Sequence, residues 1–76
     1  MRQAKTVFRR IASNEVLTPQ GQCLSQQVIE LTDGVVTNLY PLVQELSNTE
    51  WMQGQIVLKS CPNNIVRAYY KGKILT

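Results

Sequence analysis

Turn-forming residues divide the chain into short runs, and this division constrains the fold more than any other feature. Asp33-Gly34 lies between two apolar runs, and both residues tolerate the left-handed backbone angles of a tight hairpin turn. Further turn sequences are Thr18-Pro19-Gln20-Gly21, Cys61-Pro62-Asn63-Asn64 and Lys71-Gly72. The spacing predicts an all-β domain, either a small β-sandwich or a partly open barrel of about six to seven short strands.

The expected strands follow from the runs between these turns. The first two cover residues 6–12 and 15–18, separated by Ser13-Asn14, a pair prone to turns or bulges. Later strands are expected over residues 23–32, 35–40, 55–59 and 65–70, followed by Ile74-Leu75. Between Pro41 and Trp51 we expect a loop with at most one helical turn near residues 42–47, because Ser47-Asn48-Thr49 would end a longer helix.

Length and composition indicate one folded domain over residues 1–76, with residues 1–5 expected to be frayed. The hydrophobic fraction of 43% is close to the globular norm. No stretch approaches the ~20 apolar residues that span a bilayer, so no membrane partner is expected. The first residues lack the apolar run of a signal peptide, which predicts a cytoplasmic location.

The residues that carry most chemistry are absent or scattered. The chain has no histidine, and Cys23 and Cys61 lie far apart, so neither a metal nor another cofactor is expected. We expect both cysteines to be reduced and buried as small hydrophobic residues. The serines and thiols lack a histidine base, and the four glycines are too dispersed to cradle a phosphate. The sequence therefore predicts a protein that is not an enzyme and has no catalytic residues.

Charge is segregated along the chain. All eight basic residues lie in the first ten or the last eighteen positions, and all five acids lie between Glu15 and Glu50. If the end segments are neighbouring strands, the fold has a basic surface opposite an acidic one. Cations beside an aromatic side chain favour a nucleic-acid interface, whereas edge lysines also serve to prevent strand addition. The candidate residues are Lys5, Arg9, Arg67, Tyr69, Lys71 and Lys73.

The only tryptophan, Trp51, allows two interpretations. A single tryptophan is typically a core or rim residue, and Tyr40 and Phe8 have the same default interpretation. If Trp51, Leu42 and Leu46 are exposed together, they form an apolar patch of the kind that marks a partner surface.

The order of these runs resembles a known family. Phe8 to Thr18, the Asp33-Gly34 turn, and Val36 and Leu39 after it are similar to the opening strands of metal-dependent amidohydrolases. Thr49 to Leu58 resembles the segment that leads into their catalytic barrel, and Val66 to Leu75 resembles a strand pair near their far end. The resemblance covers roughly residues 6–75 and implies the small composite β-domain that flanks the barrel.

The resemblance also implies an absence. Lys59 to Asn64 stands where the family continues with proline-glycine and a His-x-His metal motif, so the barrel and its ligands are missing. No family site residue is transferred to this chain, and amidohydrolase activity is not expected. We expect a non-catalytic interaction or structural module whose partner is a protein or another copy of the chain. The alternative is a nucleic-acid-binding module that uses the basic end strands, and a small-molecule binder is a more distant third.

Overall fold

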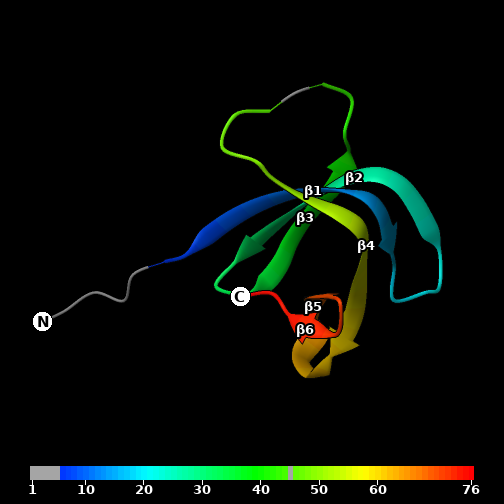
Figure 1. Ribbon diagram of the computed structural model, residues 1–76. Coiled ribbons are helices and arrows are strands. Elements are labelled where there is room, and N and C mark those ends of the chain that lie inside the picture. The colour runs from blue at the N-terminus through cyan, green and yellow to red at the C-terminus, as the bar shows by residue number, and fades with distance from the viewer. Residues whose placement is uncertain (1–5, 45) are drawn as a thin grey trace, which may run out of the picture.

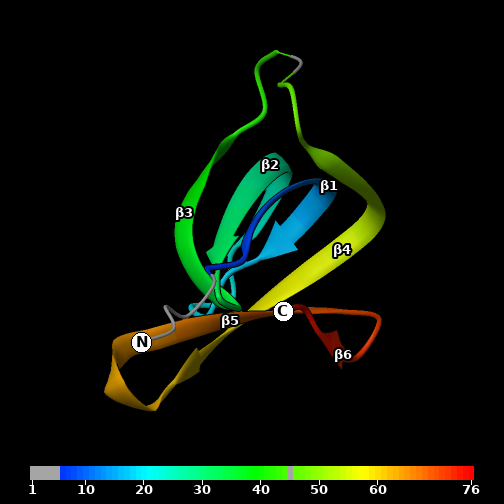
Figure 2. The ribbon, with the colours of Figure 1, turned by 90° about the vertical axis from the view of Figure 1, so that its left-hand side faces the viewer.

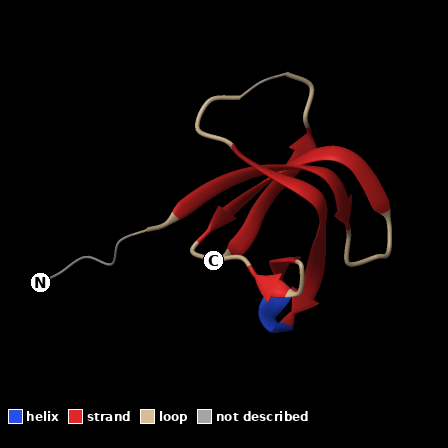
Figure 3. Ribbon diagram, in the orientation of Figure 1, coloured by secondary structure: helices blue, strands red, loops and turns tan. Residues whose placement is uncertain are grey.

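The computed structural model describes residues 6–44 and 46–76, and in them it has six strands and one short 3-10 helix (Figure 1). Strands account for almost all of the regular structure (Figure 3), so the all-β prediction is confirmed. Residues 1–5, which were expected to be frayed, lie outside the described residues. The elements are β1 (Phe8–Leu17), β2 (Cys23–Thr32), β3 (Val35–Pro41), β4 (Glu50–Cys61), η1 (Pro62–Asn64), β5 (Ile65–Tyr70) and β6 (Lys73–Ile74).

All six strands belong to one mixed sheet in the order β3-β2-β1-β4-β5-β6. The pair β1–β4 is parallel and the other pairs are antiparallel. A single sheet replaces the predicted alternative of a two-sheet sandwich. The sheet curls until β3 contacts β5, yet it is not a closed barrel (Figure 2). This arrangement agrees with the partly open alternative.

The predicted turns form where expected, and one of them becomes a bulge. Asp33 and Gly34 have φ angles of 52° and 79°, the left-handed pair that a tight hairpin needs. The two expected strands around Ser13-Asn14 are one continuous strand, β1, because this pair forms a register shift against β4 instead of a turn. Gly54, with φ of 111°, allows the shift, since its amide donates to Asn14 Oδ1 at 2.9 Å.

The core lies on the concave inner face of the curled sheet. Residues on alternate strand positions fill it, as a two-residue repeat requires. Ile56 and Leu58, predicted to share one face of β4, are both buried there. Truncating a fully buried side chain such as Ile29 to alanine is expected to cost about 2–5 kcal/mol. The main cluster consists of Ile11, Val16, Ile29, Leu31, Ile56, Leu58, Ala68 and Leu75.

The connection from β3 to β4 crosses the sheet. Strands β3 and β4 run parallel with β2 and β1 between them, so residues 42–49, here called the crossover loop, span two strands. Figure 1 shows this loop arching above the sheet. Its described residues contain no helix, so the helical turn predicted near residues 42–47 is not found there. The Ser47 carbonyl accepts a hydrogen bond from Arg10 instead of an intrahelical one. No helix in the described ranges is long and apolar enough to cross a membrane.

Candidate functional site

A second buried row lies on the outer face of the sheet, opposite the core. Ile11 and Ile29 point inward, so their neighbours Ala12 and Val28 point outward. Both are nonetheless buried, at 3% and 0% exposure. The strand register places Tyr40 beside Val28 and Trp51 beside Ala12. The outer face therefore has an apolar strip of its own beside the crossover loop.

A cavity of about 570 Å³, here called the crossover pocket, opens between this strip and the crossover loop. The structure thus brings together Leu42, Leu46 and Trp51, the three residues of the predicted apolar patch. Trp51 is 52% exposed and Val43 is 87% exposed. Of the core and rim positions expected for a single tryptophan, Trp51 therefore does not occupy the core. The lining residues are Ala12, Leu42, Val43, Gln44, Leu46, Thr49, Glu50 and Trp51.

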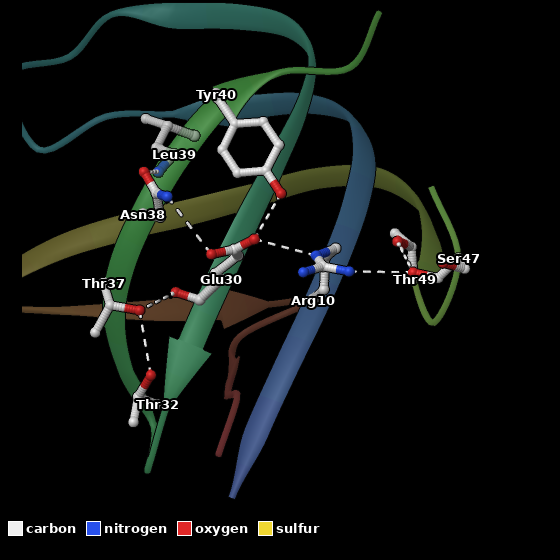
Figure 4. A network of polar contacts seen from close by, with 9 residues as sticks. All are labelled: Arg10, Glu30, Thr32, Thr37, Asn38, Leu39, Tyr40, Ser47 and Thr49. Atoms are coloured by element: carbon white, nitrogen blue, oxygen red, sulfur yellow. Dashed lines mark hydrogen bonds and ion pairs between the residues drawn. The ribbon is translucent and has the colours of Figure 1, made fainter. Parts of the chain in front are cut away.

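A polar network joins the outer face to the crossover loop (Figure 4). The Glu30 carboxylate of β2 accepts hydrogen bonds from the Tyr40 hydroxyl at 2.6 Å and from Arg10 Nε at 3.0 Å. Arg10 Nη1 also donates to the main-chain oxygen of Ser47 at 3.1 Å. One guanidinium therefore links the strand β2 carboxylate to the loop that roofs the pocket.

The network shifts the pKa of each titratable member. The Tyr40 hydrogen bond, assisted by Arg10 and Asn38, lowers the pKa of Glu30 below its ordinary value. The same carboxylate raises the pKa of the Tyr40 hydroxyl and that of the Arg10 guanidinium. At neutral pH the network thus holds an ionised carboxylate, a neutral phenol and a cation.

A second ion pair neutralises the other end of the pocket. Arg9 Nε and Nη2 donate to the two Glu50 carboxylate oxygens at 2.9 and 2.6 Å, a two-point contact. Arg9 Nη1 donates to the main-chain oxygen of Thr76 at 2.9 Å. The Arg9 hydrogen bond lowers the pKa of Glu50. Two cations from the first segment are therefore paired with two acids from the middle, so the prediction of a basic surface opposite an acidic one is wrong for this half.

The basic residues of the last segment stay together on the curled hairpin of β4, β5 and β6. Lys59 pairs with Arg67 in register and Val57 with Tyr69, which puts these side chains on the face away from Leu58 and Ala68. Arg67 and Tyr69 of β5 therefore share the outer face. Lys59 Nζ lies 4.9 Å from the Tyr69 ring centre. Lys73 pairs with Tyr70 in register and Lys71 Nζ lies beside the Tyr70 ring, so these two lie toward the opposite face of the hairpin. We call Lys59, Arg67 and Tyr69 on the outer face, together with Lys71 and Lys73 at the hairpin edge, the hairpin surface.

The two remaining residues of the predicted basic surface are not placed on the hairpin. Arg9 lies on β1, and β4 separates β1 from β5. Lys5 lies outside the described residues. The first and last strands are therefore not neighbours, and the predicted surface is reduced to its β5–β6 members.

The cysteines differ from the prediction in their burial. Both thiols are free, but Cys23 is exposed and Cys61 is half-buried. The Cys23 thiol donates to the Glu15 carboxylate, and this hydrogen bond raises the pKa of the thiol. A raised pKa makes the thiol a weaker nucleophile at neutral pH. Within residues 6–44 and 46–76, no group of three or more cysteine and carboxylate side chains is placed to hold a metal ion.

A second cavity, of about 380 Å³, lies beside the gap where the sheet fails to close. Val36 and Leu39 of β3 line one side, and Leu58 and Val66 line the other. Its remaining lining residues carry no charge and include Thr18, Thr37 and Ser60. This cavity borders the main core and has no cation or carboxylate with which to orient a ligand.

Sequence reasoning missed the network of Arg10, Glu30 and Tyr40, because these residues meet only through the register of three strands. The fold and surfaces define a small all-β domain of one curled mixed sheet with a roofed outer pocket. Comparison with family models, with curated proteins and with solved structures finds no match to the chain. The resemblance to the amidohydrolase β-domain stays a prediction.

Proposed function

We propose that this chain is a non-catalytic protein-interaction module that pairs with a second copy through the crossover pocket and the first half of β4. The observation that carries the proposal is the half-exposed Trp51, which stands beside an apolar cavity and on a strand edge that lacks a partner.

The apolar part of the surface combines exposed side chains with a cavity beside them. Val43 and Trp51 are among the most exposed large hydrophobic residues, and they border a cavity lined by Leu42 and Leu46. Burying apolar surface contributes about 25 cal/mol for each Å². Aromatic residues at the centre of an interface typically dominate its affinity. Trp51 is therefore the expected anchor.

The strand edge beside Trp51 is open. Strand β4 pairs with β5 only from Ile56 onward, so residues 50–55 have β1 on one side and, within residues 6–44 and 46–76, no strand on the other. The Tyr70 hydroxyl donates to the Gln53 carbonyl, which leaves Glu50 to Met52 as the accessible stretch. Unpaired strand edges are templates for pairing with another chain.

The other edges are protected or short. Strand β3 has a register irregularity near Thr37, and the Asn38 side chain occupies the Leu39 amide. Pro41 ends this strand and has no amide hydrogen to donate. Strand β6 has only two residues. Edge pairing is thus favoured at the start of β4.

A second copy is the partner that matches this edge. Antiparallel pairing about a twofold axis near Trp51 gives each copy the same contacts, as a closed dimer requires. Each Trp51 then packs against the apolar surface of the other copy. Among the described residues the nearby charges are paired within each chain, Arg9 with Glu50 and Arg10 with Glu30, so burial does not leave any of these four as a lone ion.

Support for a non-catalytic role comes from the chemistry of the side chains. The chain has no histidine, and the Ser13 hydroxyl is buried and donates to the Gly54 carbonyl at 2.7 Å. The exposed Cys23 thiol has a raised pKa, which disfavours the thiolate. These groups are therefore poor nucleophiles.

Sedimentation velocity across a range of about 10 to 500 µM tests the proposal. The wild-type chain is expected to shift from monomer to dimer as its concentration rises. Trp51→Lys places a charge at the edge and is expected to weaken dimerisation about tenfold or more. A wild-type chain that stays monomeric throughout would overturn the proposal.

A matched control removes a similar exposed side chain elsewhere. Ile74 is 45% exposed and lies on β6 of the hairpin, away from the pocket. Ile74→Lys adds the same charge and is expected to leave the monomer–dimer equilibrium unchanged. Circular dichroism of both variants checks that they are folded, and an equal loss of dimer in both would contradict the assignment to Trp51.

A further inference from the structure

The hairpin surface has a different chemistry from the crossover pocket and lies on a different part of the sheet. From residue 51 to residue 76 the chain contains four cations and no aspartate or glutamate. Lys59, Lys71 and Lys73 are exposed, and Arg67 is half-buried. None of the four forms an ion pair within the described residues. The positive charge of this surface is therefore uncompensated by its own strands.

The cations are arranged around two tyrosine rings. Lys59 Nζ lies 4.9 Å from the Tyr69 ring centre, and Lys71 Nζ lies 5.4 Å from the Tyr70 ring centre. The Tyr70 hydroxyl is committed to the Gln53 carbonyl, whereas Tyr69 has no hydrogen bond within the described residues. Tyr69 also lies on the face away from the core, so its ring is the better stacking platform.

Arg67 is positioned by the neighbouring β2–β3 turn. Its Nη1 donates to the Gly34 carbonyl at 3.0 Å, which is a neutral acceptor. The carboxylate of that turn, Asp33, accepts a hydrogen bond from the Val7 amide instead. One guanidinium edge is thereby fixed, and its charge is not neutralised.

Protection of a sheet edge explains only part of this surface. Lys73 lies on β6, an edge strand where a lysine discourages pairing with another chain. Lys59 and Arg67 pair with each other, but the β1–β4 pairing ends at Val57 and the β5–β6 pairing begins at Tyr69, so each of the two residues is paired on one side only. Edge protection accounts for their charges, but it does not require the Tyr69 ring between them and the end of the hairpin.

We propose that the hairpin surface binds single-stranded nucleic acid, with Lys59 and Arg67 on the phosphates beside a base stacked on Tyr69, and Lys71 and Lys73 on the phosphates that pass the hairpin edge. Tyr69 is half-buried, so part of its ring is accessible. A positive surface beside an accessible aromatic ring is the combination that binds unpaired strands, because phosphates contact the charges and bases stack on the ring. A duplex hides its base faces and can use only the cations. The proposal is independent of the dimer proposed above.

Fluorescence anisotropy of the full chain with a labelled single strand of about 12 nucleotides tests the proposal at low salt. Binding is expected to weaken as salt rises, with a log–log slope of about −0.7 for each phosphate contacted. The matching duplex is expected to bind more weakly. No binding at low salt, or equal binding of strand and duplex, would overturn the proposal.

Two pairs of variants separate stacking from charge. Tyr69→Val keeps a strand-forming residue and is expected to lose about fivefold or more in affinity with an unchanged salt slope. Phe8→Val removes an exposed aromatic ring from β1 and is expected to change nothing. Lys59→Gln is expected to reduce the salt slope, whereas Lys59→Arg keeps it. Unchanged binding by Tyr69→Val would show a general polyanion surface and contradict the stacking assignment.

Discussion

The crossover pocket and the hairpin surface both contain basic residues, but their cations are in opposite situations. Beside the pocket, Arg9 and Arg10 each contact a carboxylate, Glu50 and Glu30, within 3.0 Å. On the hairpin, Lys59 and Lys71 lie over tyrosine rings, and no acid occurs from residue 51 onward. The first set of cations is neutralised inside the fold, and the second set is left to solvent.

This difference decides what each surface can bind. A surface whose charges are paired can be covered by a protein without leaving an ion unpaired, and the pairing seen among the described residues supports the protein partner that we propose for the pocket. A surface with unpaired cations would carry a desolvation penalty against an apolar partner, yet it attracts phosphates. Basic and acidic residues are separated along the sequence, but in the folded structure Arg9 and Arg10 lie beside acids. The fold neutralises Arg9 and Arg10 of the first segment, and it leaves the four cations of the last segment without an ion pair among the described residues.

Among variants that compare the two surfaces, the largest expected effect on stability comes from removing the Glu30 carboxylate beside the pocket. Glu30→Gln replaces an acceptor of two short hydrogen bonds with a group that is half donor. Its side chain is only 16% exposed, so we expect a loss of about 1–3 kcal/mol in the free energy of unfolding, measured by urea titration. Glu15→Gln is the matched control on β1, and it should cost less than about 0.5 kcal/mol.

Protonation of the Glu30 carboxylate is expected to make the free energy of unfolding depend on pH. The pKa of Glu30 is lower in the folded state, so its contribution is complete above the ordinary glutamate pKa and is lost as the pH falls through the folded value. We expect wild-type stability to fall below about pH 4, and the fall to be smaller in Glu30→Gln. If the free energy of unfolding falls equally with pH in the two proteins, Glu30 does not cause the loss of stability in acid.

A smaller effect is expected from Tyr40→Phe, which deletes the 2.6 Å hydrogen bond and retains the ring. The loss should be about 1 kcal/mol at neutral pH. Because the folded state raises the pKa of Tyr40, its stabilisation is present below the ordinary tyrosine pKa and is lost as the pH rises through the folded value. Unfolding titrations above about pH 10 should therefore show a weaker alkaline decline in Tyr40→Phe than in the wild type.

The smallest effect on stability is expected on the hairpin. Replacing Lys71 and Lys73 together by glutamine removes two exposed cations that have no carboxylate partner. We expect the free energy of unfolding to change by less than about 0.5 kcal/mol, in thermal or urea unfolding. A loss as large as that of Glu30→Gln would mean that both sets of cations stabilise the fold, and the contrast between the two surfaces would disappear.

The sequence indicated most strands and turns, but it divided β1 into two strands and placed the start of β4 at residue 55 instead of Glu50. It did not indicate the network. A turn over Thr18 to Gly21 that closes Leu17 on Gln22 would place Arg9 opposite Glu30. The structure pairs Leu17 with Cys23, and this places Arg10 there instead. A register change of one residue moves every side chain to the other face of a strand. Turn chemistry identifies the hairpin without fixing its register, so the ion pairs could not be derived.

The apolar residues of the pocket could be predicted from the sequence, but their arrangement in space could not. The apolar character of Leu42, Leu46 and Trp51 is visible in the sequence, and the structure does gather them. Their grouping depends on the parallel pairing of β1 with β4, which sends residues 42–49 across the sheet. Parallel pairing is a long-range choice that local turn signals do not report.

Amide NMR spectra test most directly whether the crossover pocket and the hairpin surface bind different partners. Dilution of the full chain is expected to shift the single indole signal of Trp51 and the amides of residues 49–53. Addition of a short single strand is expected to shift Lys59, Arg67, Tyr69 and Lys71, and to leave the Trp51 indole in place. Shifts that spread over the same residues in both experiments would contradict the account.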